Sequence, residues 1–188
     1  AAALAYPARE DVLHHGARLA AMTHWSPQSE LACHIYALWV HHLLAGDDIA
    51  AGWHAALDTA RALHTYGDPL APDTPGPGPV PDDFFQRLAH VDDLRYDDLQ
   101  PSGYAGYCVE CLEAVAWCCL NRRRAPRVIV DAANLGGESD TIAALAGGIA
   151  GAAWGVGALP DLWLDGLDDA ARLDDLARDL AQLRAARR

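Results

Sequence analysis

Twenty consecutive residues of this 188-residue chain, from Thr141 to Pro160, carry no charged side chain. That length is about what a helix needs to cross a membrane. Five glycines and many alanines dilute the apolar surface, and Asp140 and Asp161 bracket the run where basic anchors would be expected. We therefore predict a buried, closely packed helix and no membrane segment.

Helical patterns dominate the rest of the chain. Ser26 and Pro27 form an N-cap and first-turn pair, apolar residues follow at helical spacing, and Gly46 is a C-terminal stop. Further helices are expected over 9–22, from 47 or 48 to a stop at 67, and over 83–91, 104–120, 126–135, 140 onward and 169–187. Val128–Val130 is the one β-like run, and it is too short to form a sheet. The sequence predicts an all-α fold.

One segment interrupts these helices. Between residues 68 and 83, six prolines alternate with Gly and Asp, which excludes helix and sheet alike. A second stretch, 92–103, is acidic and irregular. We expect a Pro-rich surface loop at 68–83 within a single domain covering residues 1–188.

Charge and cysteine content narrow the class of protein. Fourteen Arg and no Lys face 26 acidic residues, and the net charge of −12 repels phosphate backbones, so nucleic-acid binding is not expected. Five cysteines, four of them within residues 108–119, make a poor disulfide framework, and no export signal is legible. Both observations favour a cytoplasmic location.

Three groups of residues invite a metal or phosphate interpretation. Cys108 and Cys111 have the spacing of a zinc pair, but with Cys118 and Cys119 they fall on one predicted helix, where packing explains them. The histidines are scattered and read as ordinary surface or core residues, apart from His24. The basic cluster, formed by residues 122–124 and Arg127, follows the end of a helix, where the helix dipole favours positive charge.

The sharpest local feature is the run Asn134-Leu135-Gly136-Gly137-Glu138-Ser139-Asp140-Thr141. Its two glycines permit a turn closed to other residues and deliver oxygen-bearing side chains to the start of a helix. Glu138 and Asp140 can converge only if Glu138 lies in the turn, because residues two apart diverge on a helix. Such oxygens suit Mg²⁺ or Mn²⁺; the alternative is that Ser139 or Asp140 merely caps the helix.

Gly136-Gly137-Glu138-Ser139-Asp140-Thr141-Ile142-Ala143-Ala144 resembles the C-terminal signature of the ADP-ribosylglycohydrolase family, close to Gly-Gly-Asp-Thr-Asp-Thr-Ile-Ala-Ala before a small-residue helix. The segments Thr23-His24-Trp25-Ser26-Pro27 and 102–107 resemble other parts of that family in the same order. The first signature position is Glu138 here and Asp in the family. The resemblance implies the C-terminal portion of the family fold, without its N-terminal half.

The resemblance implies an irregular all-α bundle of the ADP-ribosylglycohydrolase type and a dinuclear Mg²⁺ or Mn²⁺ centre. Glu138, Asp140 and Thr141 would be metal ligands, and His24 and Tyr107 would line the ADP-ribose cleft. The expected activity is hydrolysis of the glycosidic bond that joins ADP-ribose to a protein side chain or a small acceptor. The general acid or base is not assigned, because the family places such groups largely in the half without a counterpart here.

A second hypothesis stays open beside the enzyme. A truncated or degenerate family member would keep the helices as a binding or structural module. In either case, apolar helices such as the one starting near Ala143 would need a partner chain or a second copy to cover them. Five tryptophans are expected to pack in the core or within a lobe (Trp39, Trp53, Trp117, Trp154 and Trp163), and Trp25 is expected at the cleft.

Overall fold

A computed structural model describes residues 1–24, 26–66, 78–81, 83–99 and 107–187, and every regular element in these ranges is a helix. This confirms the all-α prediction. The α-helices are α1 (Ala2–Ala5), α2 (Arg9–Ala21), α3 (Pro27–Ala45), α4 (Ile49–Tyr66), α5 (Phe84–Ala89), α6 (Cys108–Asn121), α7 (Ala125–Ala133), α8 (Ser139–Trp154), α9 (Asp161–Asp165) and α10 (Ala170–Ala186). Three 3₁₀ turns are η1 (Val91–Asp93), η2 (Tyr96–Leu99) and η3 (Val156–Ala158).

The helix boundaries follow the capping signals of the sequence. The Ser26 side chain accepts a hydrogen bond from the Ser29 N–H at 3.1 Å, and Gly46 ends α3 in the left-handed conformation with φ of 107°. Asp48 Oδ1 accepts from the Ala51 N–H at 2.8 Å at the start of α4. The stretch expected to be irregular instead contains η1 and η2. The stop at 67 and most of the Pro-rich segment lie outside the described residues.

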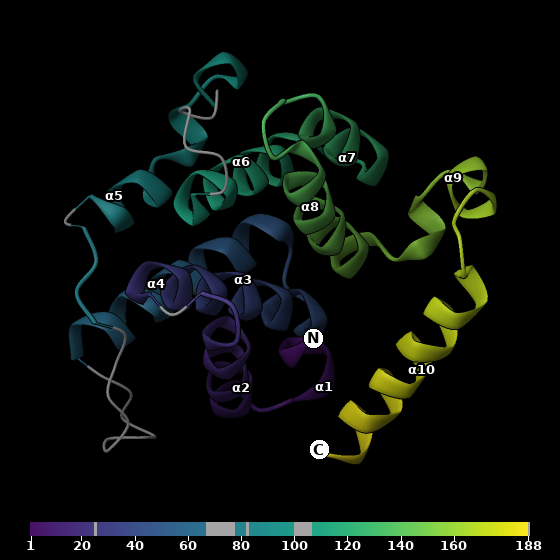
Figure 1. The fold of residues 1–188 in the computed structure, drawn as a ribbon, viewed down its shortest axis with the longest axis horizontal. Coiled ribbons are helices and arrows are strands. Elements are labelled where there is room, and N and C mark those ends of the chain that lie inside the picture. Colours follow the sequence, from purple (N-terminus) through teal and green to yellow (C-terminus); the bar gives the residue numbers. More distant parts are fainter. Residues whose placement is uncertain (25, 67–77, 82, 100–106, 188) are drawn as a thin grey trace.

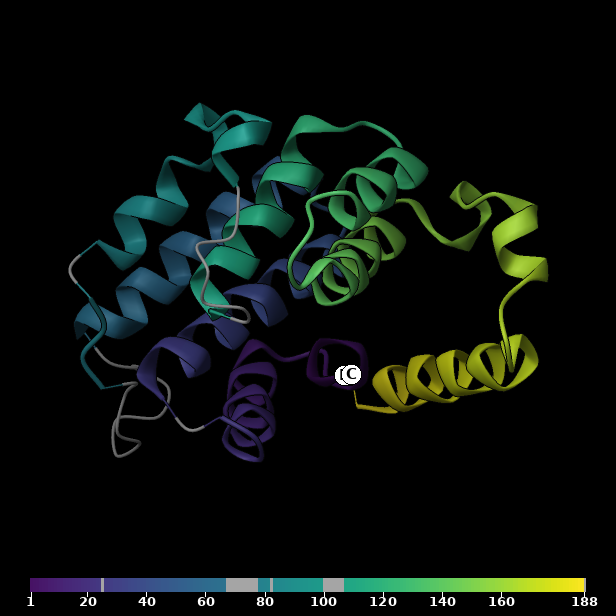
Figure 2. The same ribbon diagram turned by 45° about the horizontal axis from the view of Figure 1, so that its top comes forward.

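Helix α3 occupies the centre of the bundle, with α2, α4, α6 and α8 packed around it (Figures 1 and 2). Trp39 on α3 and Trp53 on α4 are both fully buried, and their ring centroids lie 4.9 Å apart. The Trp39 indole N–H also donates to Ile49 O at 2.9 Å. This pair fixes the α3–α4 hairpin that supports the rest of the fold.

Helix α8 packs against α3, α6 and α7, as its composition predicts. Its buried face consists of Ile142, Ala146, Ile149 and Ala150. On the α3 side the Tyr36 hydroxyl donates to Leu145 O at 2.9 Å, and a side chain at Gly148 would place its Cβ 2.4 Å from that hydroxyl oxygen. None of the described helices has the length and apolar character required to cross a membrane.

The C-terminal helices form an arm beside the bundle (Figure 1). Neither α9 nor α10 has a buried residue. Trp39, Trp53 and Trp117 are buried and Trp154 is half-buried, whereas Trp163 on α9 is 38% exposed and lies outside the buried core. The arm contacts α1 through Arg184, which donates to Ala3 O and Tyr6 O, and Arg187, which donates to Ala5 O.

Candidate active site

A tight turn connects α7 to α8 and ends at the proposed metal-binding residues. Gly136 and Gly137 have φ angles of 81° and 58°, in the region that favours glycine. Glu138 then has φ of −77° and ψ of 42°, outside the helix, and α8 begins at Ser139. The diglycine turn and the position of Glu138 in the turn are as the sequence predicts.

The oxygen-bearing side chains of this turn are accessible. Glu138 is half-buried, and Asp140 and Thr141 are exposed in the first turn of α8. The N-cap position of α8 makes no side-chain capping hydrogen bond; Asp140 Oδ1 accepts from the Thr141 N–H at 2.8 Å. The bond to the Thr141 N–H therefore engages one oxygen of Asp140, and the Glu138 side chain makes no capping hydrogen bond.

The donor chemistry of this turn fits a hard divalent cation. Two carboxylates and a hydroxyl stand at the positive end of a sixteen-residue helix. Mg²⁺ takes six oxygen ligands, so water or other residues would have to complete the shell. Within the described ranges, no three His, Cys, Asp or Glu side chains are grouped so that they could hold a metal ion. The cysteines likewise form no such group there.

The start of α6 adjoins the turn and adds a feature that sequence reasoning missed. Burial raises the pKa of the Cys111 thiol, and the nearby Cys108, Glu138 and Glu110 raise that pKa further. Glu138 thus acts electrostatically on the first turn of α6, a helix that packs against α8. Because α6 and α8 are neighbours only in the folded chain, no local sequence signal could have identified this contact.

Tyr107 and His24 lie on different parts of the bundle. Tyr107 is the half-buried residue before α6, and burial raises the pKa of its hydroxyl, with Cys108 raising it further and Arg87 opposing the shift. His24 is exposed between α2 and α3, where its N–H donates to Ala20 O at 2.9 Å. The ligand-lining roles of these two residues stay predictions, and Trp25 lies outside the described residues.

The start of α3 meets the start of α6. The Ser29 hydroxyl donates to Cys108 Sγ over 3.9 Å, and burial raises the pKa of the Cys33 thiol, with Cys108 and Glu30 adding to the shift. Helix α3 also packs on α8. The first turns of α3 and α6 are thus in contact, and the first turn of α6 approaches Glu138.

Two buried carboxylates hold the surrounding helices in place. Arg87 on α5 donates to Glu113 on α6 through Nε at 2.9 Å and Nη2 at 2.5 Å. Asp131 on α7 accepts a hydrogen bond from Arg122 Nε and forms an ion pair with Arg127 at 3.1 Å. The Arg122 guanidinium also lies over the Trp117 ring. Two residues of the basic cluster therefore have a specific partner beyond the helix dipole.

The described residues form an all-helical bundle in which a diglycine turn presents carboxylates at the start of a helix. The chain matches the ADP-ribosylglycohydrolase family over residues 1–188 and belongs to that family. It is 28% identical over 158 residues to the ADP-ribosylarginine hydrolase Tri1 of Serratia proteamaculans. The aligned region covers 84% of this chain and 37% of Tri1.

Two further similarities agree with this assignment. The ADP-ribosyl-[dinitrogen reductase] glycohydrolase of Rhodospirillum rubrum is 28% identical over 150 residues, covering 79% of this chain and 41% of that protein. A solved ADP-ribosylglycohydrolase-related protein complex superposes with a TM-score of 0.74 at 25% identity, over 96% of this chain and 56% of that one. The chain thus spans about two fifths of these curated relatives.

Proposed function

We propose that this chain contributes to a metal-dependent hydrolase that removes ADP-ribose from a modified protein side chain or a related acceptor. The observation that carries the proposal is the diglycine turn, which presents Glu138, Asp140 and Thr141 together at the start of α8 in a chain that matches this family throughout. The names of the relatives support an ADP-ribosylated protein as the partner.

In this proposal Glu138, Asp140 and Thr141 hold Mg²⁺ or Mn²⁺, in a dinuclear centre by analogy with the family. A divalent ion at that point supplies charge that orients the ribose hydroxyls and lowers the pKa of a water able to attack the anomeric carbon. Asp140 keeps its orientation through the Thr141 N–H, so one carboxylate oxygen is directed while the other remains available.

His24 and Tyr107 are proposed to line the ADP-ribose cleft. Tyr107 lies directly before α6, and its hydroxyl, which is protonated at neutral pH as tyrosine hydroxyls ordinarily are, can donate a hydrogen bond to a ligand oxygen. A cytoplasmic location remains part of the proposal, and it is supported by the five cysteines, none of which is disulfide-bonded.

The test is release of ADP-ribose from ADP-ribosylated arginine, with Mg²⁺ or Mn²⁺ supplied. Asp140→Asn should lower the rate by at least about 10-fold, since altering even groups outside the first coordination shell costs that much. Asp161→Asn, which changes an exposed aspartate at the start of α9, should leave the rate unchanged. Equal rates for the two variants would overturn the assignment of Asp140.

A non-catalytic module is the second candidate. This candidate is favoured because the described residues contain no cluster of three His, Cys, Asp or Glu side chains suited to a metal. It predicts that ADP-ribose binds to the chain without hydrolysis of the arginine linkage. Binding that needs neither added metal nor an intact Asp140 would favour this second function over the first.

A further inference from the structure

The chain enters the diglycine turn through the last turn of α7. The Asn134 N–H donates to Val130 O at 3.1 Å and to Asp131 O at 3.2 Å, and the Asn134 side-chain amide donates to Val130 O at 2.7 Å. The buried Leu135 follows, and its N–H donates to Ala132 O at 3.3 Å. The final carbonyls of α7 therefore set the direction in which the chain leaves the helix.

The turn itself offers little resistance to a change of direction. Gly136 and Gly137 both have positive φ angles, and glycine has more backbone freedom than any other residue. A Cβ at Gly136 would meet no atom of the described residues within 4 Å, so the backbone has open space on that side. The position of Glu138 is consequently set by the two ends of the turn, which are α7 and α8.

Asp131 anchors the end of α7. Its buried carboxylate accepts from Arg122 Nε and pairs with Arg127 at 3.1 Å. Its backbone carbonyl accepts from the Tyr96 hydroxyl at 3.0 Å, and the Asn134 N–H donates to this same carbonyl. Of the three side chains that bond Asp131, Tyr96 is therefore the one that acts on an atom holding the start of the turn.

The segment that carries Tyr96 is held by α6. Tyr96 begins η2, and the centroid of its ring lies 5.5 Å from that of Trp117 on α6. The Trp117 indole N–H donates to Leu94 O at 2.7 Å, which also fixes the backbone two residues before Tyr96. The Tyr96 hydroxyl thus reaches α7 from a supported segment 35 residues earlier in the chain.

We propose that Tyr96 is a positioning residue for Glu138. Its hydroxyl orients the Asp131 carbonyl, which fixes Asn134 and with it the direction of the diglycine turn. In this role Tyr96 touches neither the cation nor the substrate. The inference rests on the proposed function in that Glu138 is taken as a metal ligand, whereas the effect of Tyr96 on the turn needs no metal.

Tyr96→Phe tests this inference, because it removes the hydroxyl and keeps the ring that packs on Trp117. In the metal-free chain, hydrogen exchange of the Asn134 and Leu135 amides should become about 5-fold faster. That factor corresponds to the ordinary contribution of one hydrogen bond. For the same reason the Kd for Mn²⁺ should rise by about 5-fold.

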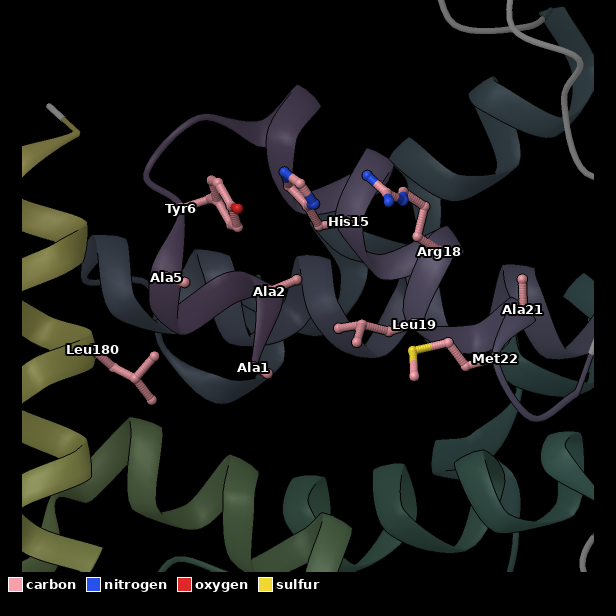
Figure 3. Close-up of a pocket in the computed structure, with 10 residues that line it drawn as sticks. All are labelled: Ala1, Ala2, Ala5, Tyr6, His15, Arg18, Leu19, Ala21, Met22 and Leu180. Atoms are coloured by element: carbon pink, nitrogen blue, oxygen red, sulfur yellow. The ribbon is translucent and has the colours of Figure 1, made fainter.

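Tyr36→Phe is the matched control, since it removes the same kind of bond, from a tyrosine hydroxyl to the Leu145 carbonyl of α8 at 2.9 Å. It should lower the stability and leave both the turn exchange and the Mn²⁺ affinity unchanged. Tyr6→Phe controls for loss of a hydroxyl elsewhere and should behave as the unaltered chain. Tyr6 lines a hollow of about 680 Å³ between α1, α2 and α10, whose lining residues do not include Asp131 or its partners (Figure 3).

Circular dichroism checks that the variants keep their helices. Exchange at Asn134 and Leu135 that is no faster in Tyr96→Phe would overturn the proposal, and so would an unchanged affinity for Mn²⁺ where the unaltered chain binds the ion. Equal changes in Tyr36→Phe would also overturn it, because they would indicate a general loss of stability. If the unaltered chain binds no Mn²⁺, the proposed function fails, whereas the exchange measurement still decides whether Tyr96 holds the turn.

Discussion

Replacing Gly148 with alanine should destabilise the protein, although alanine is the better helix former. The added Cβ would lie 2.4 Å from Tyr36 Oη, and the next atom, Cζ, is 3.8 Å away. The Tyr36 hydroxyl cannot retreat freely, because it donates to Leu145 O at 2.9 Å and fixes α3 against α8. The substitution therefore has to displace the ring or break that hydrogen bond.

Three contributions set the magnitude. Overpacking a helix interface typically costs about 1–3 kcal/mol, and a lost hydrogen bond costs about 1 kcal/mol. The higher helix propensity of alanine returns about 1 kcal/mol. The net loss in unfolding free energy should be about 2 kcal/mol, which for a chain of 188 residues lowers the melting temperature by about 4–8 °C.

Gly151→Ala is the matched control. Gly151 lies one turn further along α8, and its Cβ would meet nothing within 4 Å, so this substitution should stabilise the helix by up to about 1 kcal/mol. In a Tyr36→Phe background the clash disappears, and Gly148→Ala should no longer destabilise. Urea unfolding followed by circular dichroism measures the unaltered chain and the four variants, which are the two alanine variants, Tyr36→Phe and Tyr36→Phe with Gly148→Ala. Equal stability of the two alanine variants, or no recovery with phenylalanine, would refute the reasoning.

Three further predictions concern packing and pH. Asp131→Ala should lower the unfolding free energy by about 2 kcal/mol, because it removes the charged partner of Arg122. Asp97→Ala, at an exposed position, should change the unfolding free energy by less than about 0.5 kcal/mol, and thermal unfolding of both variants checks this difference. Asp48→Ala should cost about 1 kcal/mol through loss of the α4 cap, seen as a lower urea midpoint, and a midpoint equal to that of the unaltered chain would contradict it. Burial, with a smaller effect of Cys119, raises the pKa of Tyr36 to about 12 from a usual 10.0. The contribution of this hydroxyl to stability is therefore complete below pH 10 and is lost as the pH rises toward 12. Over that range the urea midpoint should fall less steeply in Tyr36→Phe than in the unaltered chain, and identical slopes would disprove the assignment.

The local features of the fold could be predicted because their causes are local. Ser26, Gly46 and Asp48 act on their own helix ends, and their signals do not depend on what packs nearby. The same holds for the diglycine turn, since only glycine readily adopts the φ angles found at 136 and 137. The position of Glu138 outside α8 follows from that turn.

The features that were missed depend on contacts between distant residues. Glu113 sits within an apolar helix, and nothing in its neighbourhood indicates that Arg87, 26 residues earlier, neutralises it. Trp163 is a large aromatic residue of the kind that usually packs against others, but it lies on an arm that the bundle does not cover. Helix α1 is a short alanine run without periodicity, and its contacts with α2, α3 and α10 hold it in place.

The most direct test of the central claim is binding of Mn²⁺, followed by the electron paramagnetic resonance signal of the free ion. If the turn after Gly137 gathers oxygens around a divalent cation, the unaltered chain and Asp161→Asn should deplete free Mn²⁺ equally. Asp140→Asn should bind at least about 10-fold more weakly. Binding of equal strength by Asp140→Asn, or no binding by the unaltered chain, would contradict the account.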